Sequence, residues 1–129
     1  MIFFPWIKKK EGINMATPPD ISITPKSEAT SQMLRELGLP IHRVGFHQLC
    51  IAIPQFSTNP TQSLNCDVYL YVADYFGFPD FRNIERSIRD IILFAWTNRD
   101  PAVWDAYFPG INKRPSNRLF ISTLADRLK

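Results

Sequence analysis

Glycine, histidine and cysteine are scarce in this sequence, and their scarcity excludes several classes of site. Only five glycines are present, and none belongs to a phosphate-binding loop, a nucleophile elbow or a zinc-protease motif. The two histidines, His42 and His47, are too few and too isolated for a metal site. We therefore expect no enzyme activity, no cofactor, no metal ion and no small-molecule substrate.

Long apolar runs and cysteine pairs are missing as well. A membrane helix needs about 20 apolar residues, whereas the initial MIFFPWIKKK offers about six, followed by lysines rather than preceded by them as in a secretory signal. We expect a disordered leader here, or an upstream start codon with Met15 as the alternative start, rather than a weak membrane-surface anchor. We also expect no membrane partner. Cys50 and Cys66 form no CxxC motif, which favours a reduced, cytoplasmic protein and leaves a single disulfide open.

The residues that are abundant indicate one folded domain with a modest basic excess. Apolar residues make up 45% of the 129 residues, and ten are phenylalanine, which is enough for a core without disulfides. The net charge of +3 permits a nucleic-acid partner without demanding one. Residues 1–23 are rich in proline and threonine and are expected to form a flexible tail, and residues 24–129 the folded domain.

The folded part reads as an all-α, compact six-helix domain. Thr24-Pro25 and Asp100-Pro101 pair a capping side chain with a first-turn proline, and Gly38 ends the first helix. Pro54 is expected to end the second helix, and Ser116 or Asn117 to cap the last. The first five helices are predicted at 25–37, 41–53, 66–76, 81–98 and 101–108.

The segment Val68–Trp96 has the pattern of a helix-turn-helix: a short helix, a turn with a glycine, and a longer helix. In the longer helix an apolar stripe recurs at helical spacing, and polar residues occupy the other side of its first half. Its second half, Ile91–Trp96, is apolar on all sides, and we expect it to be buried. A recognition helix needs leading turns that enter the major groove and trailing turns that anchor in the core.

The candidate base-reading residues of this helix are Arg82, Asn83, Glu85, Arg86 and Arg89. The three arginines are spaced i, i+4, i+7, so they point the same way; arginine can bind guanine with two hydrogen bonds, and glutamate can accept one from cytosine. A solvated helix face is the alternative. Glu85–Arg89 and Arg86–Asp90 are opposite-charge pairs at i, i+4 that stabilise a helix without DNA, and the sequence leaves both interpretations open.

A second basic segment precedes the last helix. Loop cations beside a helix N-terminus suit phosphate binding, although an ordinary solvated end is the favoured interpretation when this segment is taken alone. The candidate DNA-binding residues here are Lys113, Arg114 and Asn117.

The stretch Ile21–Lys129 resembles the C-terminal effector domain of the sporulation master response regulators, the stage zero sporulation protein A family. Four blocks carry the resemblance: Leu37–Gly45, Ile84–Arg89 with Ala95-Trp96, Pro115–Asn117 with Phe120-Ile121, and Ala125–Leu128. The resemblance implies a six-helix fold that binds double-stranded promoter DNA as a tandem pair. By position, Glu85, Arg86 and Arg89 match its base-reading helix, and Lys113 matches a lysine that approaches DNA. Residues 24–129 are therefore expected to be a helix-turn-helix DNA-binding effector domain.

This chain departs from the family pattern at several places. Gly77–Asp80 replaces a threonine-rich turn, Asp67 and Asp74 make the preceding helix acidic, and Asp90 replaces a histidine. Residues 1–25 are too short for the receiver domain of the family, so we expect no control by phosphorylation in cis. The acidic residues keep an alternative function open: a protein-interaction module that pairs with a full-length regulator, or with itself as a homodimer, and binds DNA weakly or not at all.

Overall fold

The described residues of this computed structural model, 25–59, 61, 63–78 and 81–128, form helices and connections without any strand. The elements are α2 (Pro25–Glu36), α3 (Val44–Thr58), the π-helical turn η2 (Leu64–Tyr69), α4 (Leu70–Phe76), α5 (Arg82–Thr97), α6 (Pro101–Tyr107) and α7 (Asn117–Asp126). The prediction of an all-α domain with six helices is confirmed. The expected tail at residues 1–23 lies outside the described residues.

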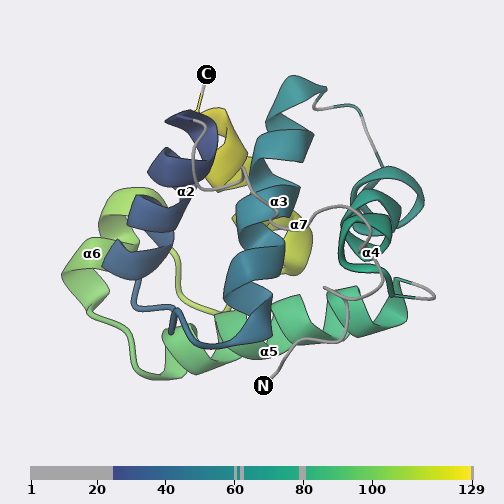
Figure 1. Cartoon of the computed structure of the whole chain (residues 1–129). Helices are drawn as coiled ribbons and strands as arrows, with labels where there is room; N and C mark the ends of the chain where they lie inside the picture. The colour runs from purple at the N-terminus through teal and green to yellow at the C-terminus, as the bar shows by residue number, and fades with distance from the viewer. Residues whose placement is uncertain (1–24, 60, 62, 79–80, 129) are drawn as a thin grey trace.

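Helix α3 stands at the centre of the fold, and the other helices surround it. Figure 1 shows α5 crossing beneath one end of α3, with α2 and α6 on one side and α4 on the other. The contacts of α3 are most extensive with α7, α2 and α5. None of the helices in the described part of the chain is long and apolar enough to cross a membrane.

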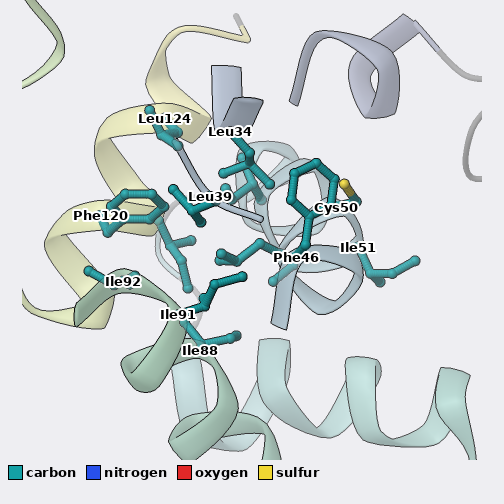
Figure 2. Packing of buried hydrophobic residues seen from close by; sticks show 14 of the residues in the cluster. Leu34, Leu39, Phe46, Cys50, Ile51, Ile88, Ile91, Ile92, Phe120 and Leu124 are labelled. Atoms are coloured by element: carbon teal, nitrogen blue, oxygen red, sulfur yellow. The ribbon is translucent and has the colours of Figure 1, made fainter. Parts of the chain in front are cut away.

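A single apolar cluster joins these helices. Figure 2 shows Ile88, Ile91 and Ile92 of α5 pointing into this cluster. Phe46 of α3 and Phe120 of α7 belong to the same cluster, and all five side chains are buried. Burial of apolar surface on this scale is the main stabilising contribution to the fold, and it holds α5 by one side only.

The predicted start and stop signals at Gly38, Gly77, Asp100 and Ser116 are in place. Asp100 caps α6, because its Oδ1 accepts a hydrogen bond from the N–H of Ala102 at 3.0 Å. Ser116 caps α7 by accepting from the N–H of Leu119 at 3.1 Å. Gly38 and Gly77 end their helices with φ of 89° and 78°, a left-handed conformation that glycine adopts without strain.

The predicted bounds of the second helix are wrong at both ends. Residues 40–43 form a turn, so α3 begins at Val44, and the helix passes through Pro54 to Thr58. Pro54 removes one backbone hydrogen bond, but the turn that follows it packs into the protein. Phe56 is buried, and the Ser57 hydroxyl donates to the Pro54 carbonyl at 2.7 Å while accepting from Lys26 Nζ at 3.1 Å. Packing in this turn therefore outweighs the lost bond.

The third predicted helix, 66–76, is also longer and less regular than expected. It begins as the π-helical turn η2 at Leu64 and becomes α-helical only from Leu70. Asp67 lies in this turn, and its Oδ2 accepts a hydrogen bond from the backbone N–H of Ser63 at 2.9 Å. The wider turn explains why the α-helical periodicity of the sequence located the end of this helix better than its start.

Candidate nucleic-acid interface

Helix α5 presents its leading turns to solvent and buries its opposite side completely. The buried residues of this helix are Ile84, Ile88, Ile91, Ile92 and Ala95. Arg82, Asn83 and Arg86 lie on the exposed side. The predicted amphipathic first half is therefore confirmed, and its exposed side offers long donor side chains to a partner.

A close backbone contact sets the height of α5 against α3. A Cβ atom on Gly45 would lie 2.8 Å from the Ser87 carbonyl oxygen and 3.0 Å from Cγ2 of Ile91. Real Cβ atoms do not approach a carbonyl that closely, so only glycine allows the first turn of α3 to lie against α5 in this way. Glycine at this position therefore allows α5 to lie close against the core helix α3.

One of the two predicted charge pairs on α5 is formed. Arg89 Nη1 lies 2.8 Å from Glu85 Oε2, and both side chains are about two-fifths exposed. Within the described residues no ion pair joins Arg86 and Asp90. The exposed side of α5 therefore carries one internally paired arginine and one arginine, Arg86, without an ion pair in the described part of the chain.

The expectation that the trailing half of α5 is buried on all sides is wrong. Leu93 is 48% and Phe94 41% exposed. The guanidinium of Arg43, at the start of α3, lies over the Phe94 ring at 4.7 Å and covers part of it. A sequence pattern does not tell how many neighbours each turn of a helix has. In the structure, the buried residues of α5 lie on its isoleucine side.

The loop before α7 places its basic residues at the surface. Lys113 is exposed, and Arg114 is half-buried, with Nη1 3.5 Å from the Pro115 carbonyl. These two cations stand beside the N-terminus of α7, which Ser116 already caps. The loop therefore offers charge to a phosphate rather than free backbone donors.

Asn117, the third residue predicted in this segment, is directed inward. Its Nδ2 donates to Tyr69 Oη at 3.0 Å and to the backbone carbonyl of Glu85 at 3.1 Å. Sequence reasoning missed Tyr69, because nothing in the pattern connects residues that lie 48 positions apart in the chain. Tyr69 is 1% exposed, and burial raises the pKa of its hydroxyl above the usual value, which keeps it neutral.

The exposed side chains of this surface include hydrogen-bond donors and cations. In the described part of the chain no group of three or more His, Cys, Asp or Glu side chains could hold a metal ion. Arginine and asparagine at the leading turns of a half-buried helix can donate to base edges, and lysine and arginine in a neighbouring loop can contact phosphates. The structure exposes Arg82, Asn83 and Arg86 at the leading turns of α5, and Lys113 in the loop before α7.

Comparison with known proteins agrees with this geometry. A family model described as the C terminal of the sporulation initiation factor Spo0A matches residues 30–128. That family is a DNA-binding transcription factor domain and not an enzyme family. No curated protein matches the chain significantly.

Proposed function

The chain belongs to the family of Spo0A C-terminal domains, and from this premise we propose that it is a sequence-specific regulator that reads double-stranded promoter DNA with α5. The observation that carries the proposal is the one-sided burial of α5. Five apolar residues on one side are buried, while Arg82, Asn83 and Arg86 are exposed at its leading turns. A recognition helix has this sidedness because it must be held by protein on one side and enter a groove on the other.

Base reading and phosphate binding fall to different residues in this proposal. Arg86 forms two hydrogen bonds to a guanine, and Glu85 with Arg89 reads a neighbouring base pair, since a carboxylate accepts from cytosine. Lys113 and Arg114 contact the backbone, which adds affinity without sequence preference. In this proposal two copies of the protein bind neighbouring half-sites on the DNA as a tandem pair.

The length of α5 agrees with a partial insertion. Its 16 residues span about 24 Å at 1.5 Å per residue, which is long enough for its leading turns to lie in the major groove while its trailing turns remain in contact with the protein. In this proposal the leading turns enter the groove, and the turns with Leu93 and Phe94 stay outside it. The two exposed apolar side chains do not obstruct this mode of binding.

The test compares Arg86→Ala with Lys113→Ala on duplexes selected from a random pool. Arg86→Ala should weaken binding to the selected duplex by about 1–3 kcal/mol and relax the preference at one base position. Lys113→Ala should weaken binding to all duplexes alike and reduce the salt dependence by about one charge. The proposal is wrong if the unmodified protein selects no sequence, or if Arg86→Ala leaves the preference at every position unchanged.

The exposed pair Leu93 and Phe94 supports a second candidate, the protein-interaction module. A solvent-exposed apolar patch on a recognition helix fits association with a full-length regulator. Salt separates the two functions. Binding to DNA through several phosphates falls steeply between low and moderate salt, whereas association through apolar side chains does not.

A further inference from the structure

The hydrogen bonds of Asn117 join three elements that the sequence keeps far apart. Asn117 is the first residue of α7, Tyr69 ends η2, and Glu85 lies in the first turns of α5. The distances from Nδ2 are 3.0 Å to Tyr69 Oη and 3.1 Å to the Glu85 carbonyl oxygen. We refer to these two hydrogen bonds as the Asn117 bridge.

The amide nitrogen of Asn117 is the part of the side chain that forms hydrogen bonds here. A side-chain amide nitrogen carries two hydrogens, and the bridge employs both. The amide oxygen, Oδ1, is buried and has no hydrogen-bond partner in the described part of the chain. A side chain retained to contact DNA would present its polar atoms outward, whereas both ends of this one are turned into the protein.

The Asn117 bridge holds the leading turns of α5, which carry Arg86 in the proposed function. The Glu85 carbonyl lies in the same helical turn as Arg86 and one turn before Arg89, so a shift of this carbonyl moves both guanidinium groups. Tyr69 is a rigid anchor, because its ring is 1% exposed within the core. Asn117 also follows directly after the loop that carries Lys113 and Arg114, so the bridge holds the end of that loop in a defined position relative to α5.

We propose that Asn117 is a positioning residue, which holds the leading turns of α5 against η2 and the basic loop so that Arg86 meets its base in the correct orientation. The inference rests on the proposed function, since it assigns no DNA contact to Asn117 itself. It replaces the sequence-based expectation that Asn117 binds DNA. Loss of the bridge should therefore lower the discrimination between sequences more than the general attraction for DNA.

Asn117→Asp is the informative variant, because it keeps the size and shape of the side chain but removes the two donors. The ionised carboxylate would face the Glu85 carbonyl, acceptor against acceptor. Asn112→Asp is the matched control: it makes the same chemical change at an exposed position of the preceding loop. Tyr69→Phe is the second variant, since it deletes one acceptor of the bridge and leaves the buried ring in place.

Two measurements are compared among these variants, both well below the melting temperature. The first is the ratio of affinities for the selected duplex and for a mixed-sequence duplex of equal length. Asn117→Asp removes both hydrogen bonds of the bridge and should reduce this ratio about tenfold, whereas Tyr69→Phe removes one of them and should reduce it less. Asn112→Asp should weaken both duplexes alike and leave the ratio unchanged. A residue with a purely structural role would lower the melting temperature without changing the ratio.

The second measurement needs no DNA. Amide hydrogen exchange in the leading turns of α5 should become faster in Asn117→Asp than in the unmodified protein, while exchange in its trailing turns stays the same. If the ratio and the exchange both stay at the unmodified values, the positioning role is wrong. If the unmodified protein shows no sequence preference, the proposed function fails together with the DNA part of this inference, and the exchange measurement still decides whether the bridge holds α5.

Discussion

Helices α3 and α5 have nearly the same length and touch each other, yet they use their surfaces in opposite ways. Ten of the 15 residues of α3 are buried, against five of the 16 residues of α5. A helix covered on most sides can only support its neighbours, whereas a helix covered on one side can present the other side to a partner. The difference agrees with the proposed binding surface on α5 and with a supporting role for α3.

Substitutions of two adjacent residues of α5 test this comparison most directly. Ile92 is fully buried and Leu93 is 48% exposed. Ile92→Ala should lower the free energy of unfolding by about 2–5 kcal/mol, because it removes buried methyl groups and leaves a cavity. Leu93→Ala should lower it by less than about 1 kcal/mol. Chemical denaturation measures both, and equal losses would mean that α5 is not held by one side.

The contact between the two helices can be tested at Gly45. Gly45→Ala introduces a Cβ at 2.8 Å from the Ser87 carbonyl, and such overpacking should lower the free energy of unfolding by about 1–3 kcal/mol. The higher helix propensity of alanine offsets part of this loss, by at most about 1 kcal/mol. Thermal unfolding checks the sign. A more stable variant would show that α3 and α5 lie further apart than described.

The sequence predicted the bounds and the leading half of α5 well and α3 poorly, and the two helices show why. The stripe from Ile84 to Ala95 repeats at helical spacing, so the bounds of α5 and the one-sided burial of its first half could be read from the pattern itself. In α3 the packing of Phe56 carries the helix through Pro54, and a sequence pattern contains no information on that packing. Tertiary contacts decide such cases against local propensity.

The residues of the candidate site, like the bounds of the helices, could be predicted only in part. Arg82, Asn83 and Arg86 are exposed as expected, because a residue opposite an apolar stripe faces solvent. The exposure of Leu93 and Phe94 was not predictable, since apolar character does not tell how many neighbours surround a residue. The inward direction of Asn117 depends on Tyr69, and only the folded chain brings those two residues together.

A smaller effect is expected at the ion pair on the exposed side of α5. Glu85→Gln removes the attraction to Arg89, and should lower the free energy of unfolding by about 0.2–0.5 kcal/mol, an effect that high salt screens. Asp90→Asn is the matched control, because no ion pair joins Asp90 to Arg86 among the described residues. Thermal melts at low and high salt compare the two, and equal losses would contradict a specific contribution from the pair.

The last prediction concerns the reactivity of Cys50 on the buried side of α3, where we expect no modification in the folded protein. Burial raises the pKa of the Cys50 thiol to about 12, so the thiolate, which is the reactive form, is scarce at neutral pH. An alkylating reagent should leave Cys50 unmodified at pH 7.5 in the folded protein and modify it after unfolding in denaturant. Mass mapping of the peptide that contains Cys50 gives the result, and rapid labelling without denaturant would show that this side of α3 opens.

The aromatic surroundings of Trp104 make its fluorescence a probe of the fold. Its indole N–H donates to the Leu37 carbonyl at 3.0 Å, and the rings of Phe108 and Trp96 lie 5.5 and 5.6 Å from its own. An excited indole shielded from water in this way emits at shorter wavelength than one in solvent. Trp104 belongs to α6 and Trp96 to α5, so a red shift of the Trp104 emission would report that water has reached the contact region of these two helices.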